Sequence, residues 1–212
     1  MILTKHQRVN VLHLFKVKRS LDIIFSLLFI ILLLPFFFIV SIVVAFFLGS
    51  PVIFTQRRPG KNGKIFTLFK FRTMTREADE NGVLLADDVR LTKIGRFLRA
   101  TSLDELPELF NILYGDMSFI GPRPLLEEYL PLYSKEQSRR HEVTPGLTGL
   151  AQINGRNLLN WEDRFKLDVH YVDNWDLYLD FKILLHTIVK VFQREGIESE
   201  HSSTMPKFQG NK

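Results

Sequence analysis

The hydrophobic pattern of the chain is dominated by one uncharged apolar run over residues 23–48. No ionisable side chain lies between Asp22 and Arg57, and the run of about 26 residues is long enough for one helix to cross a bilayer. Pro35 lies near its middle, where a proline removes a backbone donor and kinks a helix. The pattern therefore predicts a membrane-inserted helical element that is broken at Pro35.

Basic residues flank the apolar run on both sides, and Lys and Arg near membrane segments tend to stay in the cytoplasm. Two cytoplasmic flanks favour a re-entrant hairpin that enters the membrane, bends and returns. The alternative is a signal-anchor helix that spans the bilayer with a tolerated proline, and both interpretations stay open. The basic residues are Lys5, Arg8, Lys16, Lys18 and Arg19 before the run, and Arg57, Arg58, Lys61, Lys64, Lys70 and Arg72 after it.

The rest of the pattern predicts a mainly α fold with a short β-hairpin. We divide the chain into a basic amphipathic interfacial segment (1–22), a re-entrant membrane hairpin (23–50), a small cytoplasmic catalytic domain (51–195) and a polar tail (196–212). Strand-like segments at 52–55 and 64–72 flank a Pro-Gly-Lys-Asn-Gly turn and predict the hairpin, and residues 75–90 predict a mobile loop. Helices are expected at 91–98, 106–113, 124–138, 161–175 and 177–192, some of them lying flat on the membrane.

Composition narrows the choice of partners and compartment. The formal net charge of +5 and the pI of about 9.5 suit anionic lipid or a phosphate-rich substrate. No nucleic-acid-binding signature is present, so we expect no nucleic-acid partner. The absence of cysteine excludes disulfides and thiolate metal sites. The histidines are scattered, and His141 and His170 are expected on the surface.

Two adjacent carboxylates, Asp104 and Glu105, follow a basic stretch that contains Arg96 and Arg99. Ser102 and Glu105 have the S-x-x-E spacing of a capping box, and spacing alone favours this purely structural role. The functional alternative is that one carboxylate attacks phosphorus while its neighbour binds Mg²⁺. Arginines and a helix N-terminus would keep such a carboxylate ionised at neutral pH.

Two proline- and glycine-rich segments are further candidates. In Gly121-Pro122-Arg123-Pro124, the prolines fix the backbone around one arginine, whose guanidinium could fork onto phosphate oxygens at little ordering cost. A structural turn with a solvated arginine is equally compatible with this segment. Residues 144–157 form a run of turns dense in polar side chains, which suits a polar ligand or a simple connection between helices.

Taken together, these motifs resemble the bacterial sugar transferase family, the small monotopic phosphoglycosyl transferases. The likeness runs from about residue 18 to the C-terminus, in order and at the family's spacing. The tail at 207–212 is similar to the branch that starts bacterial N-linked glycans. The matching segments are residues 54–60, Lys70-Phe71-Arg72-Thr73-Met74, residues 102–107, residues 115–124, Pro145-Gly146-Leu147-Thr148-Gly149 and residues 152–157.

The resemblance implies a transfer of sugar-1-phosphate from a UDP-sugar to undecaprenyl phosphate, with release of UMP. Asp104 would be the nucleophile that forms a phosphosugar-aspartate, and Glu105 would bind the Mg²⁺ cofactor. The implied substrate-binding residues are Lys70, Arg99, Pro122, Arg123 and Arg156. Pro35 matches the proline that breaks the family's re-entrant helix, although close relatives carry Ser where this chain has Leu34.

The resemblance also implies a place and partners for the enzyme. It would lie on the cytoplasmic face of the bacterial inner membrane, among membrane lipids and later glycosyltransferases of a glycoconjugate pathway. The sugar suggested by the N-linked glycan branch is N,N′-diacetylbacillosamine. Two alternatives stay open, namely a membrane-anchored scaffold without catalysis and a direct Mg²⁺-dependent transfer without an enzyme-bound intermediate.

Overall fold

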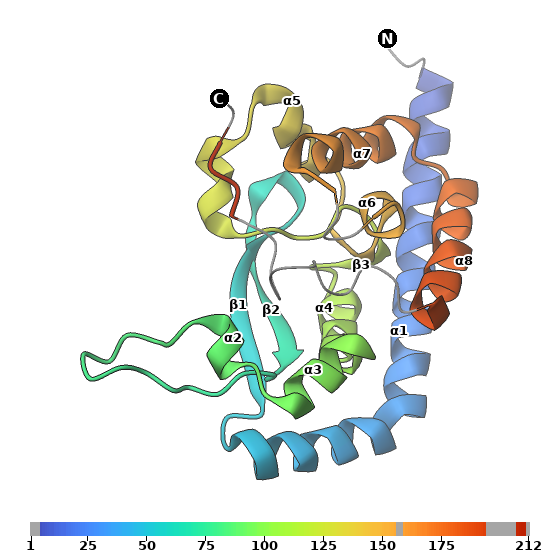
Figure 1. Cartoon of the computed structure of the whole chain (residues 1–212). Helices are drawn as coiled ribbons and strands as arrows, with labels where there is room; N and C mark the ends of the chain where they lie inside the picture. The colour runs from blue at the N-terminus through green and yellow to red at the C-terminus, as the bar shows by residue number, and fades with distance from the viewer. Residues whose placement is uncertain (1–4, 156–158, 194–206, 211–212) are drawn as a thin grey trace.

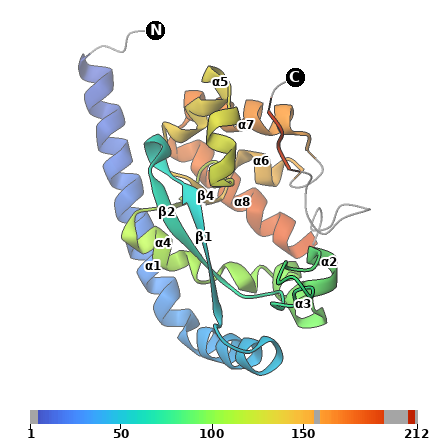
Figure 2. The same ribbon diagram turned by 90° about the vertical axis from the view of Figure 1, so that its left-hand side faces the viewer.

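A long bent helix, α1, lies along one edge of a domain of short helices and small sheets (Figure 1). The computed structural model describes residues 5–155, 159–193 and 207–210. α1 (Lys5–Leu48) is continuous through Pro35, and it is bent into two arms (Figure 1, Figure 2). A proline favours such a bend because it removes one helical hydrogen bond. The expected apolar element is therefore one bent helix rather than two helices separated by a break.

The predicted β-hairpin is confirmed. β1 (Ile53–Pro59) and β2 (Ile65–Phe71) are antiparallel neighbours, and a 3₁₀ turn at Lys61–Gly63 joins them. Asn62 in this turn has a left-handed backbone with φ of +56°, which asparagine tolerates better than most residues.

A second small sheet, which the hydrophobic pattern does not predict, lies deeper in the domain. β3 (Ser118–Ile120) pairs in parallel with β4 (Gly146–Thr148). Strands of three residues are too short to produce a recognisable alternation of apolar and polar positions. The pair matters because each strand runs into one of the proline- and glycine-rich segments.

The helices mostly follow the predicted order, so the mainly α class is confirmed. The expected helix over 124–138 is wrong in part, because a 3₁₀ segment at Glu127–Leu132 contains Pro131 and only four residues become α-helical afterwards. Proline lacks the amide hydrogen that a helix interior needs. The helices after α1 are α2 (Asp87–Arg90), α3 (Lys93–Ala100), α4 (Glu108–Tyr114), α5 (Lys135–Ser138), α6 (Leu150–Ile153), α7 (Trp161–Asn174) and α8 (Leu177–Gln193).

Among the described side chains of α1, the buried ones form one narrow stripe that faces the domain. Its buried residues recur at helical spacing, and most other large apolar side chains of the helix are exposed. Residues 13–48 are long and apolar enough to cross a membrane by length and composition, and little of the most apolar stretch is buried. The helix therefore offers a broad apolar face without a protein partner among the described residues. The stripe consists of Asp22, Ser26, Ile30, Val40 and Val44.

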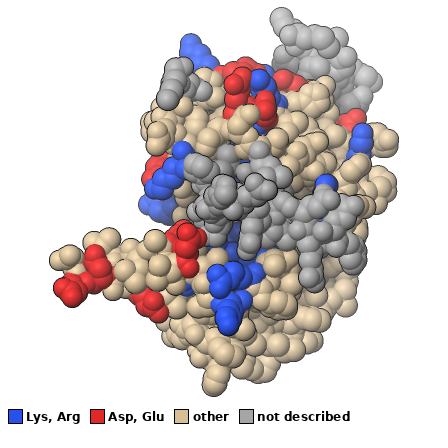
Figure 3. Space-filling model, in the orientation of Figure 1, with Lys and Arg blue, Asp and Glu red and all other residues tan. Residues whose placement is uncertain are grey.

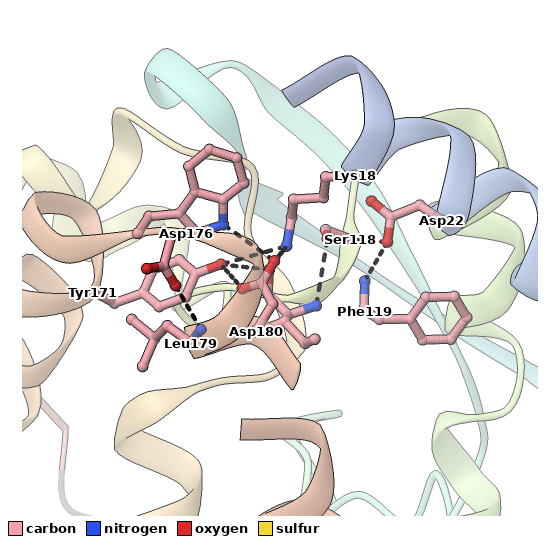
Figure 4. A network of polar contacts seen from close by, with 10 residues as sticks. Lys18, Asp22, Ser118, Phe119, Tyr171, Asp176, Leu179 and Asp180 are labelled. Atoms are coloured by element: carbon pink, nitrogen blue, oxygen red, sulfur yellow. Dashed lines mark hydrogen bonds and ion pairs between the residues drawn. The ribbon is translucent and has the colours of Figure 1, made fainter. Parts of the chain in front are cut away.

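Buried polar contacts tie α1 to the domain where the apolar run begins (Figure 4). Lys18 Nζ lies 2.5 Å from Asp180 Oδ2 of α8, and the Tyr171 hydroxyl donates to Asp180 Oδ1 at 2.7 Å. Asp22 Oδ1 accepts hydrogen bonds from the Ser118 hydroxyl and the Phe119 amide, both at 3.1 Å. At least one of the basic residues that flank the run therefore anchors the helix to the domain, in addition to any role in topology.

The sequence pattern predicts a loose C-terminal tail over 196–212, but residues 207–210 pack against the domain. Residues 207–210 are described, and Phe208 is only 6% exposed. Its ring is buried among four other aromatic rings whose centroids lie 5.1–5.9 Å away. A single apolar residue in a polar segment gives no periodic signal, which explains the wrong expectation. The four rings belong to Tyr129, Tyr133, Trp161 and Phe165.

Residues 75–90, expected as a loop, project from the body of the domain (Figure 1). They contain one bridge between Ala78 and Leu84 and end in α2. Their carboxylates give the projection an acidic surface, whereas Lys and Arg side chains gather on the adjoining face (Figure 3). The segment is therefore irregular as expected, but it has local structure of its own.

His141 is buried at 8% exposure, so its expected surface position is wrong, whereas His170 is exposed as expected. The Nδ1 atom of His141 lies 3.3 Å from the carbonyl oxygen of Gly60, and this contact links His141 to the β-hairpin turn. Burial lowers the pKa of His141 to about 4, and the neighbouring charge of Arg140 adds to the effect.

The buried histidine predicts a loss of stability in mild acid. In the unfolded chain its pKa would be near 6.5, so between about pH 6.5 and pH 4 the unfolded state binds the extra proton. The free energy of unfolding should fall by about 2 kcal/mol from pH 7 to pH 5 through this group alone. Urea titrations should show that His141→Gln removes this part of the pH dependence. An equal pH dependence in the variant and the wild type would contradict the assignment.

Candidate active site

Asp104 and Glu105 lie in a short 3₁₀ turn, Leu103–Glu105, between α3 and α4. Ser102, just before the turn, has a left-handed backbone with φ of +56°, and its side chain makes no capping bond. The expected capping box is therefore wrong. Non-glycine residues in such strained conformations concentrate at functional sites. A capping role therefore does not explain why Ser102 and Glu105 have this spacing.

Glu105 is held by two cations from distant parts of the chain. Lys70 Nζ on β2 donates to Glu105 Oε1 at 2.7 Å, and Arg123 Nη2 donates to the same oxygen at 2.5 Å. Among the described residues, the second carboxylate oxygen, Oε2, has no bonded partner. The fold therefore brings together three of the predicted site residues around one carboxylate oxygen.

Glu108, on the first turn of α4, is a site residue that sequence reasoning misses. Its side chain is 2% exposed, and its Oε1 lies 3.0 Å from Lys70 Nζ without the geometry of a good hydrogen bond. The ammonium group of Lys70 is thus shared between Glu105 and Glu108. The available signal is their spacing of three residues, which places both on one face of a helical turn.

The same surroundings shift the pKa values of the three carboxylates in different directions. Burial raises the pKa of Asp104 to about 6, and the charge of Glu105 adds to this rise. Burial alone would also raise the pKa of Glu105, but the charges of Arg123 and Lys70 outweigh it and hold that pKa well below its usual range. Burial raises the pKa of Glu108 to about 7 despite the nearby ammonium of Lys70. Asp104 is thus mostly ionised at pH 7 but less strongly acidic than an exposed aspartate, which suits a nucleophile.

Arg99, at the end of α3, lies close enough for its charge to lower the pKa of Asp104. Its Nε donates to the Thr73 hydroxyl at 3.1 Å. Gly95 lets α3 approach this point, because a Cβ there would lie 1.8 Å from the carbonyl oxygen of Thr73. Arg99 therefore adds a third cation to the site, beside Lys70 and Arg123.

The Gly-Pro-Arg-Pro loop, residues 121–124, carries Arg123 and packs backbone to backbone against the second glycine-rich segment. A Cβ on Gly146 would lie 2.1 Å from the amide nitrogen of Gly121, and a Cβ on Gly149 would lie 2.1 Å from its carbonyl oxygen. Larger residues at these two glycines would push the segments apart. Pro122 contributes through its backbone, since its carbonyl oxygen accepts a hydrogen bond from the Gly146 amide at 3.0 Å.

Two predicted residues, Arg156 and Pro35, are not part of the described site. Arg156 lies outside the described residues, so its expected role in nucleotide binding stays a prediction. Pro35 belongs to the exposed part of α1 and is a structural candidate only. Within the described ranges, no group of three or more His, Asp or Glu side chains is placed to hold a metal ion.

Comparison with known proteins identifies the family. Residues 13–194 match the model of the bacterial sugar transferase family. The chain is 59% identical over 169 residues to an uncharacterized sugar transferase, EpsL, of Bacillus subtilis, with 80% of this chain and 84% of the relative covered. It is also 40% identical over 198 residues to the exopolysaccharide production protein ExoY of Sinorhizobium fredii, with 84% of this chain and 87% of that protein covered.

Larger relatives contain the same unit as part of a longer chain. The chain is 44% identical over 186 residues to the UDP-glucose:undecaprenyl-phosphate glucose-1-phosphate transferase of Klebsiella pneumoniae. The match covers 82% of this chain but only 40% of that enzyme. The expected enzyme class, a phosphoglycosyl transferase, is confirmed: this chain belongs to the bacterial sugar transferase family.

Proposed function

We propose that this chain transfers a sugar-1-phosphate from a UDP-sugar to undecaprenyl phosphate and releases UMP. The printed activities of two relatives support the proposal, since the Klebsiella enzyme is a glucose-1-phosphate transferase and a Salmonella typhimurium relative is an undecaprenyl-phosphate galactose phosphotransferase. The observation that carries it is the site itself, where a buried aspartate adjoins a carboxylate held by Lys70 and Arg123.

The chemistry we propose has two balanced steps. A carboxylate oxygen of Asp104 attacks the β-phosphorus of the UDP-sugar, and the bond from that phosphorus to the bridging oxygen breaks, so that UMP leaves with the electron pair. An oxygen of undecaprenyl phosphate then attacks the same phosphorus and regenerates the Asp104 carboxylate. A covalent intermediate separates the nucleotide from the lipid phosphate, two anions that repel each other.

The cations of the site fit the charges that this reaction develops. Arg123 and Arg99 would neutralise phosphate oxygens, and Arg123 can do so with a planar fork of donors. Lys70 is less available for substrate, because two carboxylates share its ammonium group. We infer that Lys70 organises the carboxylates and that the arginines hold the diphosphate.

Mg²⁺ is the proposed cofactor, and the residues present fit it. Magnesium is usually bound through one or two carboxylates together with substrate phosphates rather than by an all-protein cage. Glu105 would be the principal ligand, since its Oε2 takes no bond from the described residues. Once bound, the ion would neutralise charge on the diphosphate.

The proposed location is the cytoplasmic face of the bacterial inner membrane. The exposed apolar face of α1 and its bend support a re-entrant anchor, and exposed apolar residues of α8 such as Tyr178, Phe181 and Leu185 support an interfacial position for that helix. Membrane lipids and later glycosyltransferases of the pathway are the proposed partners.

The re-entrant topology predicts that both flanks of α1 face the cytoplasm. The chain has no native cysteine, so Arg8→Cys and Lys64→Cys each introduce one unique label site. In intact cells, a membrane-impermeant maleimide should label neither variant until the inner membrane is opened. Labelling of the residue 8 variant from outside would show that α1 spans the bilayer.

The proposed reaction predicts UMP release that depends on both substrates. Purified full-length protein in lipid nanodiscs should release UMP from one UDP-sugar of a panel when undecaprenyl phosphate and Mg²⁺ are present. We propose UDP-N,N′-diacetylbacillosamine or a related UDP-N-acetylhexosamine as that sugar, because the tail at 207–212 is similar to PglC, the family member that starts bacterial N-linked glycans. No release from any sugar of the panel would overturn the proposed function.

A further inference from the structure

A buried ion pair behind the candidate active site contacts the loop that carries Arg123. Arg140 lies in a 3₁₀ turn at Arg139–His141, and Asp168 lies on α7. Both side chains are 2% exposed. Arg140 Nε and Nη2 donate to Asp168 Oδ2 at 3.0 and 2.7 Å. The same Nη2 donates to the backbone carbonyl oxygen of Arg123 at 2.7 Å. The ion pair is thus joined directly to the backbone of a proposed phosphate-binding residue.

The Gly-Pro-Arg-Pro loop needs outside support because two of its four residues are prolines and lack amide hydrogens. Three consecutive carbonyl groups of the loop each accept a hydrogen bond from a different element. The Pro122 carbonyl accepts from the Gly146 amide at 3.0 Å, the Arg123 carbonyl from Arg140, and the Pro124 carbonyl from Arg58 Nη1 at 3.3 Å. The middle contact is the shortest of the three and fixes the residue that reaches Glu105.

A buried ion pair is weak evidence for a role in stability, because apolar residues of similar volume can often replace it without loss. Asp168 has a clear local purpose here, since it compensates the charge of Arg140 and fixes the direction of its guanidinium. The faces of Tyr133 and Phe165, whose ring centroids lie 5.9 and 5.8 Å from Arg140 Cζ, pack around the same group. Arg140 is therefore rigidly held while one of its nitrogens is presented to the loop.

We propose that Arg140 and Asp168 are positioning residues that hold Arg123 in the orientation required for the reaction. The path runs from Asp168 to Arg140, then to the Arg123 carbonyl, and from the Arg123 guanidinium to Glu105 at 2.5 Å. The inference rests on the proposed function, because it assigns the loop's rigidity to phosphoryl transfer. Without the Arg140 contact, Arg123 keeps its charge but loses its fixed direction.

The test compares UMP release by the wild type and by variants of the full chain in nanodiscs. The substrate is the UDP-sugar that the wild type uses fastest. The main variant is Arg140→Met with Asp168→Leu, which replaces the ion pair by apolar side chains. We expect kcat/KM to fall by about 10²-fold, because a displacement of about 1 Å at a catalytic group costs that much. The fall should lie mainly in kcat, and the midpoint of thermal unfolding should stay close to that of the wild type.

The matched control is Arg139→Ala with Asp173→Ala. This exposed pair joins the same 3₁₀ turn to the same helix, α7, but makes no bond to the loop. Its removal should leave kcat/KM within about 2-fold of the wild type, since exposed pairs contribute little. A main variant that folds and is as active as this control would overturn the inference.

A second variant decides the matter if the apolar pair fails to fold. Arg140→Lys keeps the charge beside Asp168 but lacks the forked nitrogens that serve both acceptors. A loss of about 10-fold or more in kcat with unchanged thermal unfolding would support the positioning role, because misplacement lowers the rate without unfolding the chain. Unchanged kcat would overturn it. A wild type that releases no UMP would overturn the proposed function, and the inference with it, whereas an active wild type with unaffected variants overturns the inference alone.

Discussion

Replacement of Asp104 by Asn should abolish both UMP release and the covalent adduct. The side chain is 7% exposed and lies beside Glu105, and burial raises its pKa only to about 6, so it is mostly ionised at pH 7. Asparagine keeps the shape of the side chain but has no anionic oxygen to attack phosphorus. We expect kcat to fall on the order of 10⁴-fold, as for the loss of other catalytic nucleophiles.

The adduct is the more direct measurement. Intact-protein mass spectrometry of the wild type mixed with UDP-sugar and Mg²⁺, without lipid acceptor, should show an added mass equal to the sugar phosphate. Asp104→Asn should show none. The matched control is Asp173→Asn, which changes an exposed aspartate of α7 and should form the adduct normally.

Three outcomes separate the competing mechanisms. An adduct that persists in Asp104→Asn would refute the assignment of the nucleophile. UMP release without any adduct, combined with sequential kinetics, would favour direct transfer between the two substrates. Normal glycan assembly by cells that carry Asp104→Asn would favour a non-catalytic scaffold.

The sequence predicts best what depends on long or strong patterns. The apolar run is the strongest pattern in the sequence, and it lies within α1, a bent helix that contains Pro35. The hairpin is predicted by two segments rich in β-branched and aromatic residues on either side of a Pro-Gly turn, and the pairing of β1 with β2 confirms it. Such features are local, so their signals lie within a few residues of each other.

Contacts between distant segments could not be predicted in the same way. The partners of Glu105 come from positions 35 residues earlier and 18 residues later in the chain. Their motifs nominate Lys70 and Arg123 separately, but no spacing rule says that both would bind one oxygen. Arg140 and Asp168 give no signal of their roles, because an arginine next to Arg139 and an aspartate on an amphipathic segment are both typical of surface positions.

Two local predictions failed because tertiary contacts override local chemistry. Ser102 and Glu105 have the spacing of a capping box, but the cations beside Glu105 outcompete the backbone amide, and Ser102 takes a left-handed conformation. Phe208 lies in a polar tail, but burial of its ring among other aromatic side chains fixes residues 207–210 in place. In both cases the deciding partner is far away in sequence.

Replacement of Lys70 by Met should destabilise the protein strongly as well as inactivate it. The ammonium group lies 2.7 Å from Glu105, which is partly buried, and 3.0 Å from Glu108, which is buried. Its loss leaves Arg123 as the remaining ion-pair partner of Glu105 among the described residues and leaves Glu108 without one. Loss of one partner from a buried ion pair costs about 3–5 kcal/mol, because the remaining charge is uncompensated. Urea unfolding at pH 8, above the pKa of about 7 that Glu108 has beside Lys70, should show a loss of this size.

The charge balance can be restored in part by a second substitution. Glu108→Gln in the Lys70→Met background removes one of the two uncompensated charges while keeping the shape of the side chain. The double variant should regain about 1–2 kcal/mol of the lost stability without regaining activity, because Glu105 still lacks one of its two cations. Lys166→Met, which removes an exposed lysine paired with Glu162, is the control and should change stability by no more than about 0.5 kcal/mol. If the double variant is no more stable than Lys70→Met alone, then Lys70 does not serve to neutralise Glu108, and the shared ammonium is not what holds these carboxylates together.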